Sequence, residues 1–235
     1  MGEIGRGYGS EWHLLRYMGR HRNQLQETIL SKTGGEKIEW CDSEFSLKNE
    51  PLEHDIELKG VDFLPDPIIR KEWTETWPQT GNVHNWDAVG QLVINNKKEW
   101  LLVEAKAHLG ELKSECGAEP EGNSRKKIVD AMNSAKKSFN AENTSVDNWL
   151  APYYQFCNRL TMLQFLNENQ VKARLLFIYF YGDKDKEHIK KYPQSAKEWE
   201  SELERMYQWT GIDKKSCIWK RVHIIPISTN PLVIK

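Results

Sequence analysis

Four short segments of this 235-residue sequence place an acidic residue two positions before a lysine. On a β-strand that spacing puts a carboxylate and an ammonium group on the same face, where they could bind a divalent cation and orient a water molecule. The pattern is common by chance, so the surrounding residues must separate a candidate site from a solvated face. The four copies are Glu57-Leu58-Lys59, Glu104-Ala105-Lys106, Glu111-Leu112-Lys113 and Asp213-Lys214-Lys215.

Only the second copy lies on a face that is otherwise apolar. In the first copy all the charged residues share one face, which is typical of a solvated strand or turn. The third and fourth copies lie in polar loops next to glycines and need no special explanation. In the strand expected over residues 100–107, Trp100 and Leu102 precede Glu104 and Lys106 on one face, and apolar residues fill the other. We therefore expect this strand to be covered on both sides, with the charged pair at its carboxyl end.

A second carboxylate is expected beside this pair. Residues 85–94 and 100–107 predict a hairpin, and a turn centred near residues 96–97 brings Asp87 opposite residues 104–106. Two carboxylates close together favour a raised pKa or a bound divalent cation, because one lysine neutralises two acids poorly. Oxygen ligands of this kind suit Mg²⁺ or Mn²⁺. The alternative is a structural ion pair in which the acid and the lysine of the triplet satisfy each other.

The expected first helix contributes one more acid. Ser10 is expected to cap this helix, and an apolar stripe runs through Leu14, Leu15 and Met18. Glu11 falls on the same stripe. It is predicted either to face the sheet as an extra metal or water ligand, or only to complement the helix dipole from the first turn.

The helix expected over residues 151–167 is apolar on nearly all sides, so we expect it to be buried. Gln155, Asn158 and Arg159 form a short polar stripe on it. Buried polar groups need partners, so these residues either hydrogen-bond to the backbone or support the site and contact phosphate, for which a guanidinium group is well shaped. Tyr154 is predicted to stack on a base or to fill the core.

The order of the expected elements is that of an α/β protein with a central mixed sheet and helices on its faces. A single helix that ends at Gly34-Gly35 is followed by a meander of strands, which begins with a strand over residues 37–47. After a loop over residues 110–122, helices and strands alternate to a closing strand over residues 218–227. Residues 49–82, which hold many of the prolines and several tryptophans, are expected to form an irregular excursion over the core. We expect one domain over residues 1–235.

The composition restricts the class of protein. Hydrophobic residues make up 39% and charged residues 29%, and 33 basic residues nearly balance 34 acidic ones. This is typical of a soluble globular protein without a global basic field. No signal peptide is expected, and the apolar run over residues 175–181 is too short to span a membrane. The four cysteines are widely spaced, which argues against a zinc site and favours reduced thiols in a cytoplasmic protein.

These features resemble the PD-(D/E)XK nuclease superfamily and its restriction-endonuclease-like core. The stretch that carries the resemblance is NWDAVGQLVINNKKEWLLVEAKAH, residues 85–108, followed by the helix that contains YYQFCNRL. In this resemblance Asp87 and Glu104 bind Mg²⁺ or Mn²⁺, and Ala105 adds its backbone carbonyl. Trp86 stands where the family motif has the proline from which it takes part of its name, and this departure lowers the specificity of the match.

The function that the resemblance implies is metal-dependent hydrolysis of phosphodiester bonds in DNA or RNA, with DNA favoured as the partner. Lys106 would orient the attacking water or help to deprotonate it, and Glu11 would match an acid of the first helix that some branches carry. A homodimer is compatible with this reading. The alternatives are a non-catalytic nucleic-acid-binding or scaffold protein with the same fold, and a structural ion-pair cluster in an unrelated α/β protein.

Overall fold

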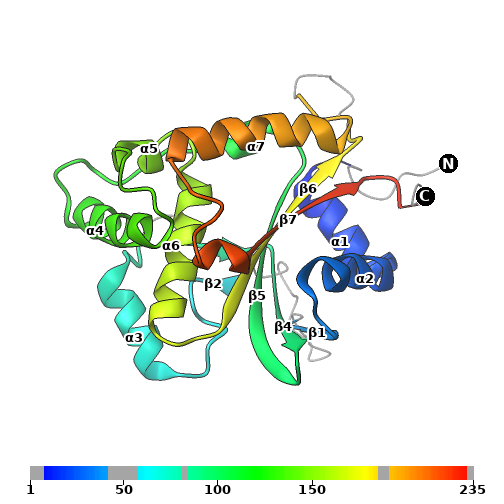
Figure 1. Cartoon of the computed structure of the whole chain (residues 1–235), viewed down its shortest axis with the longest axis horizontal. Helices are drawn as coiled ribbons and strands as arrows, with labels where there is room; N and C mark the ends of the chain where they lie inside the picture. Colours follow the sequence, from blue (N-terminus) through cyan, green and yellow to red (C-terminus); the bar gives the residue numbers. More distant parts are fainter. Residues whose placement is uncertain (1–7, 42–57, 81–83, 185–190, 232–235) are drawn as a thin grey trace, which may run out of the picture.

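A five-stranded mixed sheet forms the centre of the computed structural model, which describes residues 8–41, 58–80, 84–184 and 191–231 (Figure 1). The strand order is β1-β4-β5-β6-β7. The first three strands form an antiparallel meander, and β6 and β7 run parallel to β5. Their bounds are β1 Lys37–Trp40, β4 Ala88–Ile94, β5 Lys97–Lys106, β6 Ala173–Tyr181 and β7 Val222–Ser228.

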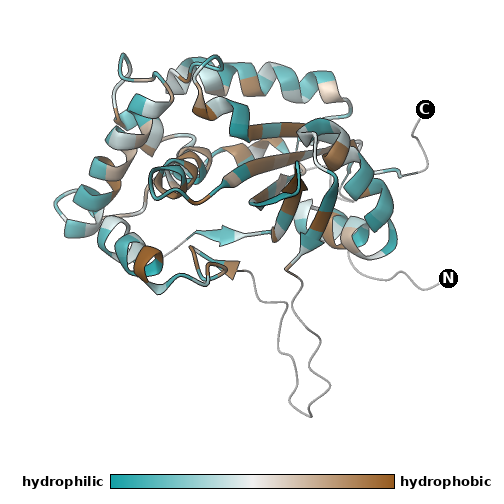
Figure 2. Cartoon of the chain, turned by 60° about the horizontal axis from the view of Figure 1, so that its bottom comes forward, coloured by the Kyte–Doolittle hydropathy of each residue, from teal (hydrophilic) through white to brown (hydrophobic). Residues whose placement is uncertain are grey.

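Helices cover both faces of the sheet, as the sequence predicts (Figure 1). On one face lie α1 (Ser10–Arg20) and α2 (Arg22–Thr33). The other face is covered by α6 (Tyr154–Glu168) and α7 (Ala196–Thr210), with further helices packed outside α6. These outer helices are α3 Pro67–Thr76, α4 Asn123–Ser138 and α5 Asp147–Leu150. The apolar residues are concentrated in the strands of the sheet, and the helices around it are largely hydrophilic on their outer sides (Figure 2).

Strand β5 contributes to two separate cores, as its alternation predicts. Leu102 packs with the residues under α6 and α7. Leu101, Val103 and Ala105 point to the opposite side and join the core under α1 and α2. Since successive side chains of a strand alternate between its faces, Glu104 belongs to the α6 side. The carboxylate is thus directed into a closed helix–sheet interface.

The hairpin turn is shorter than expected but preserves the expected register. Asn95 and Asn96 have positive φ angles of 50° and 58°, which is the backbone of a two-residue type I′ turn, for which asparagine is well suited. Strand β5 begins directly after them, and the ladder ends with Ala88 opposite Val103. Continued by one residue, this register brings Asp87 opposite Glu104, within the range that the sequence predicts.

The first helical region differs from the expectation. Two helices separated at His21 replace the single expected helix, and Gly9, not Ser10, is the N-cap of α1. Leu15, which the apolar stripe places in the core, is 57% exposed, whereas His13 is buried. The wider spacing of apolar residues beyond Met18 permits the break, because each short helix needs to bury only one face.

Residues 49–82 contain more regular structure than the expected irregular excursion. Helix α3 lies within them, and Asp66 caps it by accepting a hydrogen bond from the N–H of Ile68, with Pro67 in the first turn. A short ladder also joins β2 (Leu58–Lys59) to β3 (Asn85–Trp86). The expected strand over residues 37–47 is a strand from Lys37 to Trp40, and its part beyond residue 41 lies outside the described residues.

Smaller differences occur at other boundaries. The helix expected from residue 151 begins at Tyr154, and the expected last strand begins with a 3₁₀ turn, Ile218–Arg221, before β7. The loop expected after β5 opens with another 3₁₀ turn, Leu109–Leu112. Among the described residues no helix combines the length and the apolar character that a membrane crossing requires.

Candidate active site

Asp87 and Glu104 meet where the pairing of β4 with β5 ends. The ladder stops at Ala88, and the chain before Asp87 diverges into β3, which pairs with β2 instead. The N–H of Asp87 donates to the carbonyl of Val103 at 3.1 Å. Its side chain then accepts the N–H of Ala105 at 2.6 Å. The carboxylate of Asp87 thus takes the place that a backbone carbonyl would occupy in a continuing ladder.

Glu104 is held by two cations. Its side chain is buried, with a residue exposure of only 3%. Oε2 accepts a hydrogen bond from Nε of Arg159 at 2.8 Å, and Oε1 accepts one from Nζ of Lys106. Lys106 retains a small exposed fraction at the end of the strand, whereas Arg159 is buried. The two cations approach Glu104 from the helix and from the same strand, so its carboxylate has little freedom to rotate.

Arg159 is the centre of a wider network. Nη1 donates to Oδ1 of Asn158 at 3.0 Å, and Nη2 donates to the carbonyl of Asn85 at 2.6 Å. The guanidinium carbon lies 4.9 Å from the ring centroid of Trp86, a distance typical of a cation–π contact. The predicted hydrogen bonding of Arg159 and Asn158 is therefore seen, while support of a reaction site and contact with phosphate stay predictions.

The two carboxylates differ in their electrostatic state. Burial raises the pKa of Asp87 to about 7, and the negative charge of Glu104 adds to this rise. For Glu104, burial also acts to raise the pKa, but the charges of Arg159 and Lys106 outweigh it, so the pKa lies below its usual range. Glu104 is thus stabilised as an anion by the protein, while burial and the charge of Glu104 favour the protonated form of Asp87.

The donor set fits a hard divalent cation. The two carboxylates come from adjacent segments, and the Ala105 carbonyl points toward the same open end of the ladder, because the N–H and C=O of one strand residue face the same neighbour. All these donors are oxygen atoms, which Mg²⁺ and Mn²⁺ prefer, with water completing the shell. No cluster of three or more His, Cys, Asp or Glu side chains suited to a metal occurs among the described residues, so water would supply several ligands.

Glu11 is not brought into this cluster. It is exposed on the solvent side of α1, because the buried face of that helix runs through His13 and Tyr17 instead. Ser10 of α1 contacts the 3₁₀ turn after β5, where its hydroxyl donates to Oε1 of Glu111 at 3.1 Å. Of the two predicted roles of Glu11, the one in which it faces the sheet is therefore wrong, whereas its place in the first turn of α1 agrees with the role of complementing the helix dipole.

Glu111, from the third acid-x-Lys copy, has a definite structural role that its loop setting does not predict. Its Oε2 accepts the backbone N–H groups of Ala107 and His108. His108 caps the 3₁₀ turn that follows, and its Nε2 lies 3.4 Å from Oε1 of Glu111. Glu111 therefore anchors the chain directly after Lys106 and limits its movement at the site.

Tyr154 and Gln155 lie in the first turn of α6, near the site but outside the ion-pair network. Both are half-buried. The N–H of Gln155 donates to the hydroxyl of Ser114 at 2.7 Å, and burial raises the pKa of Tyr154 above its usual range. At about 1.5 Å of rise per residue, this turn lies roughly 6–8 Å along the helix axis from Arg159. Their contact with substrate stays a prediction.

His84 is the residue near the site that the sequence patterns do not single out. Its side chain is buried, and its Nε2 lies 2.9 Å from the backbone carbonyl of Asn158. The isolated histidine has no ligand spacing, and its partner is a backbone atom 74 residues away in sequence. The tryptophans around it, including Trp86, are the only local signal of a buried position.

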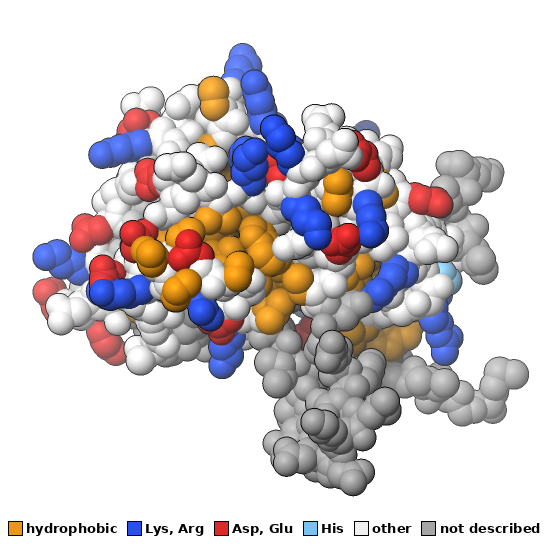
Figure 3. Space-filling view, turned by 90° about the horizontal axis from the view of Figure 1, so that it is seen from below, with side chains coloured by type: hydrophobic (Ala, Val, Ile, Leu, Met, Phe, Trp, Pro, Cys, Tyr) orange, Lys and Arg blue, Asp and Glu red, His pale blue; other side chains and the backbone are white. Residues whose placement is uncertain are grey.

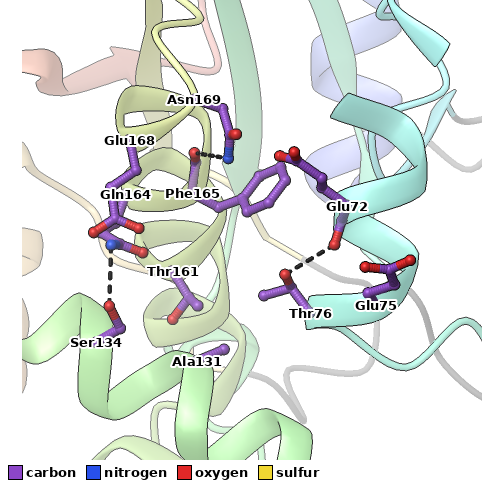
Figure 4. A pocket seen from close by; sticks show the side chains of 10 residues that line it. All are labelled: Glu72, Glu75, Thr76, Ala131, Ser134, Thr161, Gln164, Phe165, Glu168 and Asn169. Atoms are coloured by element: carbon purple, nitrogen blue, oxygen red, sulfur yellow. Dashed lines mark hydrogen bonds between the residues drawn. The ribbon is translucent and has the colours of Figure 1, made fainter. Parts of the chain in front are cut away.

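A pocket of about 270 Å³ lies away from these residues, between α3, α4 and α6 (Figure 4). Glu72, Glu75 and Glu168 line it together with polar and apolar side chains. Carboxylates repel phosphate groups, so this pocket is poorly suited to a nucleic acid. On the face seen in Figure 3, Lys and Arg side chains are interspersed with Asp and Glu, in keeping with the net charge of −1.

Comparison of the chain with family models, with curated proteins and with solved structures gives no match. The architecture is an α/β fold with a five-stranded mixed sheet between helices. Any assignment of function therefore depends on the geometry around Asp87, Glu104 and Lys106.

Proposed function

We propose that the protein is a metal-dependent phosphodiesterase of the PD-(D/E)XK kind, acting on nucleic acid and preferentially on DNA. The observation that carries this proposal is the position of Asp87, whose carboxylate bonds to the Ala105 N–H between Glu104 and Lys106 on the adjacent strand. Lys106 and Arg159 are both bound to Glu104, and burial together with the charge of Glu104 raises the pKa of Asp87 to about 7, so the ionised form of Asp87 has a deficit of positive charge. A divalent cation would remove it.

The sheet topology is consistent with a restriction-endonuclease-like core. An antiparallel meander of β1, β4 and β5 precedes a crossover that contains α6, and β6 then returns parallel to β5. The proposed site lies at the carboxyl end of β5, where β4 and β5 part. In that arrangement Arg159 of α6 contacts Glu104.

Each residue of the site has a proposed part. Asp87, Glu104 and the Ala105 carbonyl would hold Mg²⁺ or Mn²⁺. When bound, the cation supplies positive charge to the phosphate and lowers the pKa of the attacking water. Lys106, whose ammonium group already contacts Glu104 and retains some exposure, would hold that water and favour its deprotonated form.

Arg159 would support the reaction indirectly, because its guanidinium group fixes the Glu104 carboxylate and offsets its charge. Tyr154 and Gln155, in the adjacent turn of α6, are the proposed contacts to the substrate. Strandedness and sequence preference are properties that the activity assay would determine.

The activity test compares the purified protein with single variants in Mg²⁺ or Mn²⁺, on single-stranded, double-stranded and branched DNA and on RNA. Glu104→Ala and Lys106→Ala should each lower cleavage by roughly a hundredfold or more, the usual loss when a group that stabilises the transition state is removed. Glu99→Ala is the matched control, since Glu99 is also on β5 and paired with two arginines, but at the other end of the strand. Cleavage that persists unchanged in Lys106→Ala and Glu104→Ala would show that the site is elsewhere.

A second candidate function is a non-catalytic nucleic-acid-binding or scaffold protein with the same fold. The observation that favours it is the double ion pair of Glu104, which leaves that carboxylate balanced without a metal. Titration with Mn²⁺ separates the two: binding that disappears in Asp87→Ala supports the enzyme, and no binding in the wild type supports the scaffold.

A further inference from the structure

His84 connects the segment before Asp87 to helix α6. It is 2% exposed, and its Nε2 lies 2.9 Å from the backbone carbonyl of Asn158. Because a carbonyl can only accept, Nε2 must carry the proton and donate it. Nδ1 is buried without a hydrogen-bond partner among the described residues. Burial, with the charge of Arg159, lowers the pKa of His84 to about 3, so the ring stays neutral at ordinary pH.

Three tryptophans enclose the His84 ring. Trp73 of α3 and Trp77, which directly follows this helix, contact it edge-on, with ring centroids 5.3 Å and 4.8 Å away. Trp86 lies nearly parallel to it at 6.4 Å. The ring cannot turn away from the Asn158 carbonyl without displacing these side chains. The segment over residues 49–82 thus has a definite effect on the site, because its Trp73 and Trp77 form two walls of this enclosure.

The hydrogen bond of His84 is one of two that join the segment before Asp87 to helix α6. Consecutive residues of α6, Asn158 and Arg159, bind consecutive residues of the strand segment: His84 Nε2 donates to the Asn158 carbonyl, and Arg159 Nη2 donates to the Asn85 carbonyl at 2.6 Å. Two hydrogen bonds at adjacent positions fix both the distance and the rotation of this segment relative to the helix. Asp87 follows two residues later, and Arg159 holds Glu104 at the same time.

We infer that His84 is a positioning residue of the proposed metal site, which sets the place of Asp87 relative to Glu104 by donating a hydrogen bond to the Asn158 carbonyl of α6. This inference rests on the proposed function. A role in packing alone would not need a ring nitrogen, and an apolar side chain in the same enclosure would avoid the unpartnered Nδ1, which is costly to bury.

Three variants separate positioning from packing. His84→Gln places its amide N–H₂ near the position of Nε2 and should restore the donor. His84→Asn is equally polar but places its amide near Nδ1, too far from the carbonyl. His84→Phe fills the aromatic enclosure without any donor. Circular dichroism and thermal unfolding identify the variants that fold, and the Gln–Asn pair keeps the comparison valid if the Phe variant does not.

The first readout is the NMR chemical shift of the Ala105 amide proton, which the Asp87 carboxylate accepts at 2.6 Å. Asp87→Ala gives the shift expected when this hydrogen bond is lost. We expect His84→Asn and His84→Phe to move the resonance toward that value, and His84→Gln to leave it near the wild-type position. This readout needs neither metal nor substrate. A wild-type shift in a folded His84→Asn variant would overturn the inference.

The second readout is the Kd for Mn²⁺. It should rise roughly tenfold in His84→Asn and His84→Phe, as is typical when a partner of a metal ligand is removed, and return toward wild type in His84→Gln. Equal affinity in all three variants would also count against the inference. Failure of the proposed function is recognised separately, because wild-type protein that binds no Mn²⁺ or cleaves nothing leaves the Ala105 comparison intact.

Discussion

Nε of Arg159 donates to Oε2 of Glu104 across 2.8 Å, and both side chains are buried. Helix α6 thereby keeps the acid of β5 ionised in the protein interior, whereas Asp87, which bonds to a backbone N–H, has a pKa raised to about 7 by burial and by the charge of Glu104. Glu104 is thus held in its ionised form and Asp87 is held toward its protonated form. We therefore expect loss of the acid to destabilise the protein at Glu104 and to stabilise it at Asp87.

Removing Glu104 should destabilise the protein strongly. Glu104→Ala leaves the buried guanidinium group of Arg159 without its anion, and breaking a buried pair in this way costs about 3–5 kcal/mol. Urea unfolding near pH 7 measures the change in the free energy of unfolding. Glu99→Ala, in the more exposed ion-pair cluster of the same strand, should cost clearly less. An equal loss in both variants would show that Arg159 does not depend on Glu104.

Asp87→Asn should stabilise the metal-free protein above neutral pH. The folded pKa of Asp87 is raised to about 7 from an ordinary value of 3.8, so the folded state retains a proton that the unfolded state releases between these values. The stability that protonated Asp87 contributes to the folded state is therefore fully present below about pH 4 and is lost as the pH rises through about 7. Asparagine keeps an acceptor for the Ala105 N–H but has no charge to bury.

The measurement for Asp87→Asn is the free energy of unfolding in EDTA at about pH 5 and about pH 8. The advantage of the variant should grow between these values by roughly 1–2 kcal/mol, less than a full shift of the pKa would give because the side chain is only half-buried. A pH-independent difference would mean that Asp87 is ionised in the folded protein at both values.

The central features of the site follow from local patterns. Alternation in β5 predicts that Glu104 faces an apolar interface, and the asparagine turn sets the register that brings Asp87 beside it. These features depend on a period of two residues and on a short connection, both of which are visible in a sequence. The mixed sheet between helices is predicted for the same reason, because the order of the elements restricts their packing.

The remaining features depend on contacts between distant segments. The alternative in which Glu11 faces the sheet is wrong because the face that α1 presents to the sheet is determined by packing against the strands, where Tyr17 donates to the Ser228 carbonyl. The role of His84 cannot be predicted from the sequence, because the hydrogen-bond acceptor of its ring is a helix backbone carbonyl, which no residue type marks. Glu111 is a similar case, since its carboxylate binds N–H groups that become available only where β5 ends.

Mn²⁺ should raise the thermal stability of the wild type but not of Asp87→Asn. A ligand that binds only the folded state adds about 2.7 kcal/mol when its free concentration is 100 times Kd. For a chain of this size, that corresponds to a rise in Tm of roughly 5–10 °C. Differential scanning calorimetry at neutral pH measures the shift, with Ca²⁺-free buffer and EDTA as the reference. Equal shifts in wild type and Asp87→Asn would indicate a cation site elsewhere on the protein.

Lys106→Met should separate catalysis from metal binding. The methionine keeps the length of the apolar side chain but cannot hold or help to deprotonate a water molecule, so kcat should fall roughly 10²–10⁴-fold, the usual contribution of general acid–base catalysis. The Kd for Mn²⁺ should change little, because Lys106 supplies no metal ligand. Lys98→Met, on the same strand but paired with Glu39 at the surface, is the control. A fall in metal affinity that matches the fall in kcat would place Lys106 in metal binding instead.

His84→Gln should make the protein less sensitive to acid. Burial, aided by Arg159, lowers the pKa of His84 to about 3 from an ordinary value of 6.5. The unfolded state therefore gains a proton that the folded state does not bind, and the stability that the neutral ring contributes is complete above about pH 6.5 and is lost as the pH falls toward 3. Relative to His84→Gln, the wild type should lose roughly 2 kcal/mol between about pH 8 and about pH 5. Paired urea titrations at the two values measure this difference, and parallel losses in the two proteins would show that His84 takes up a proton in the folded state.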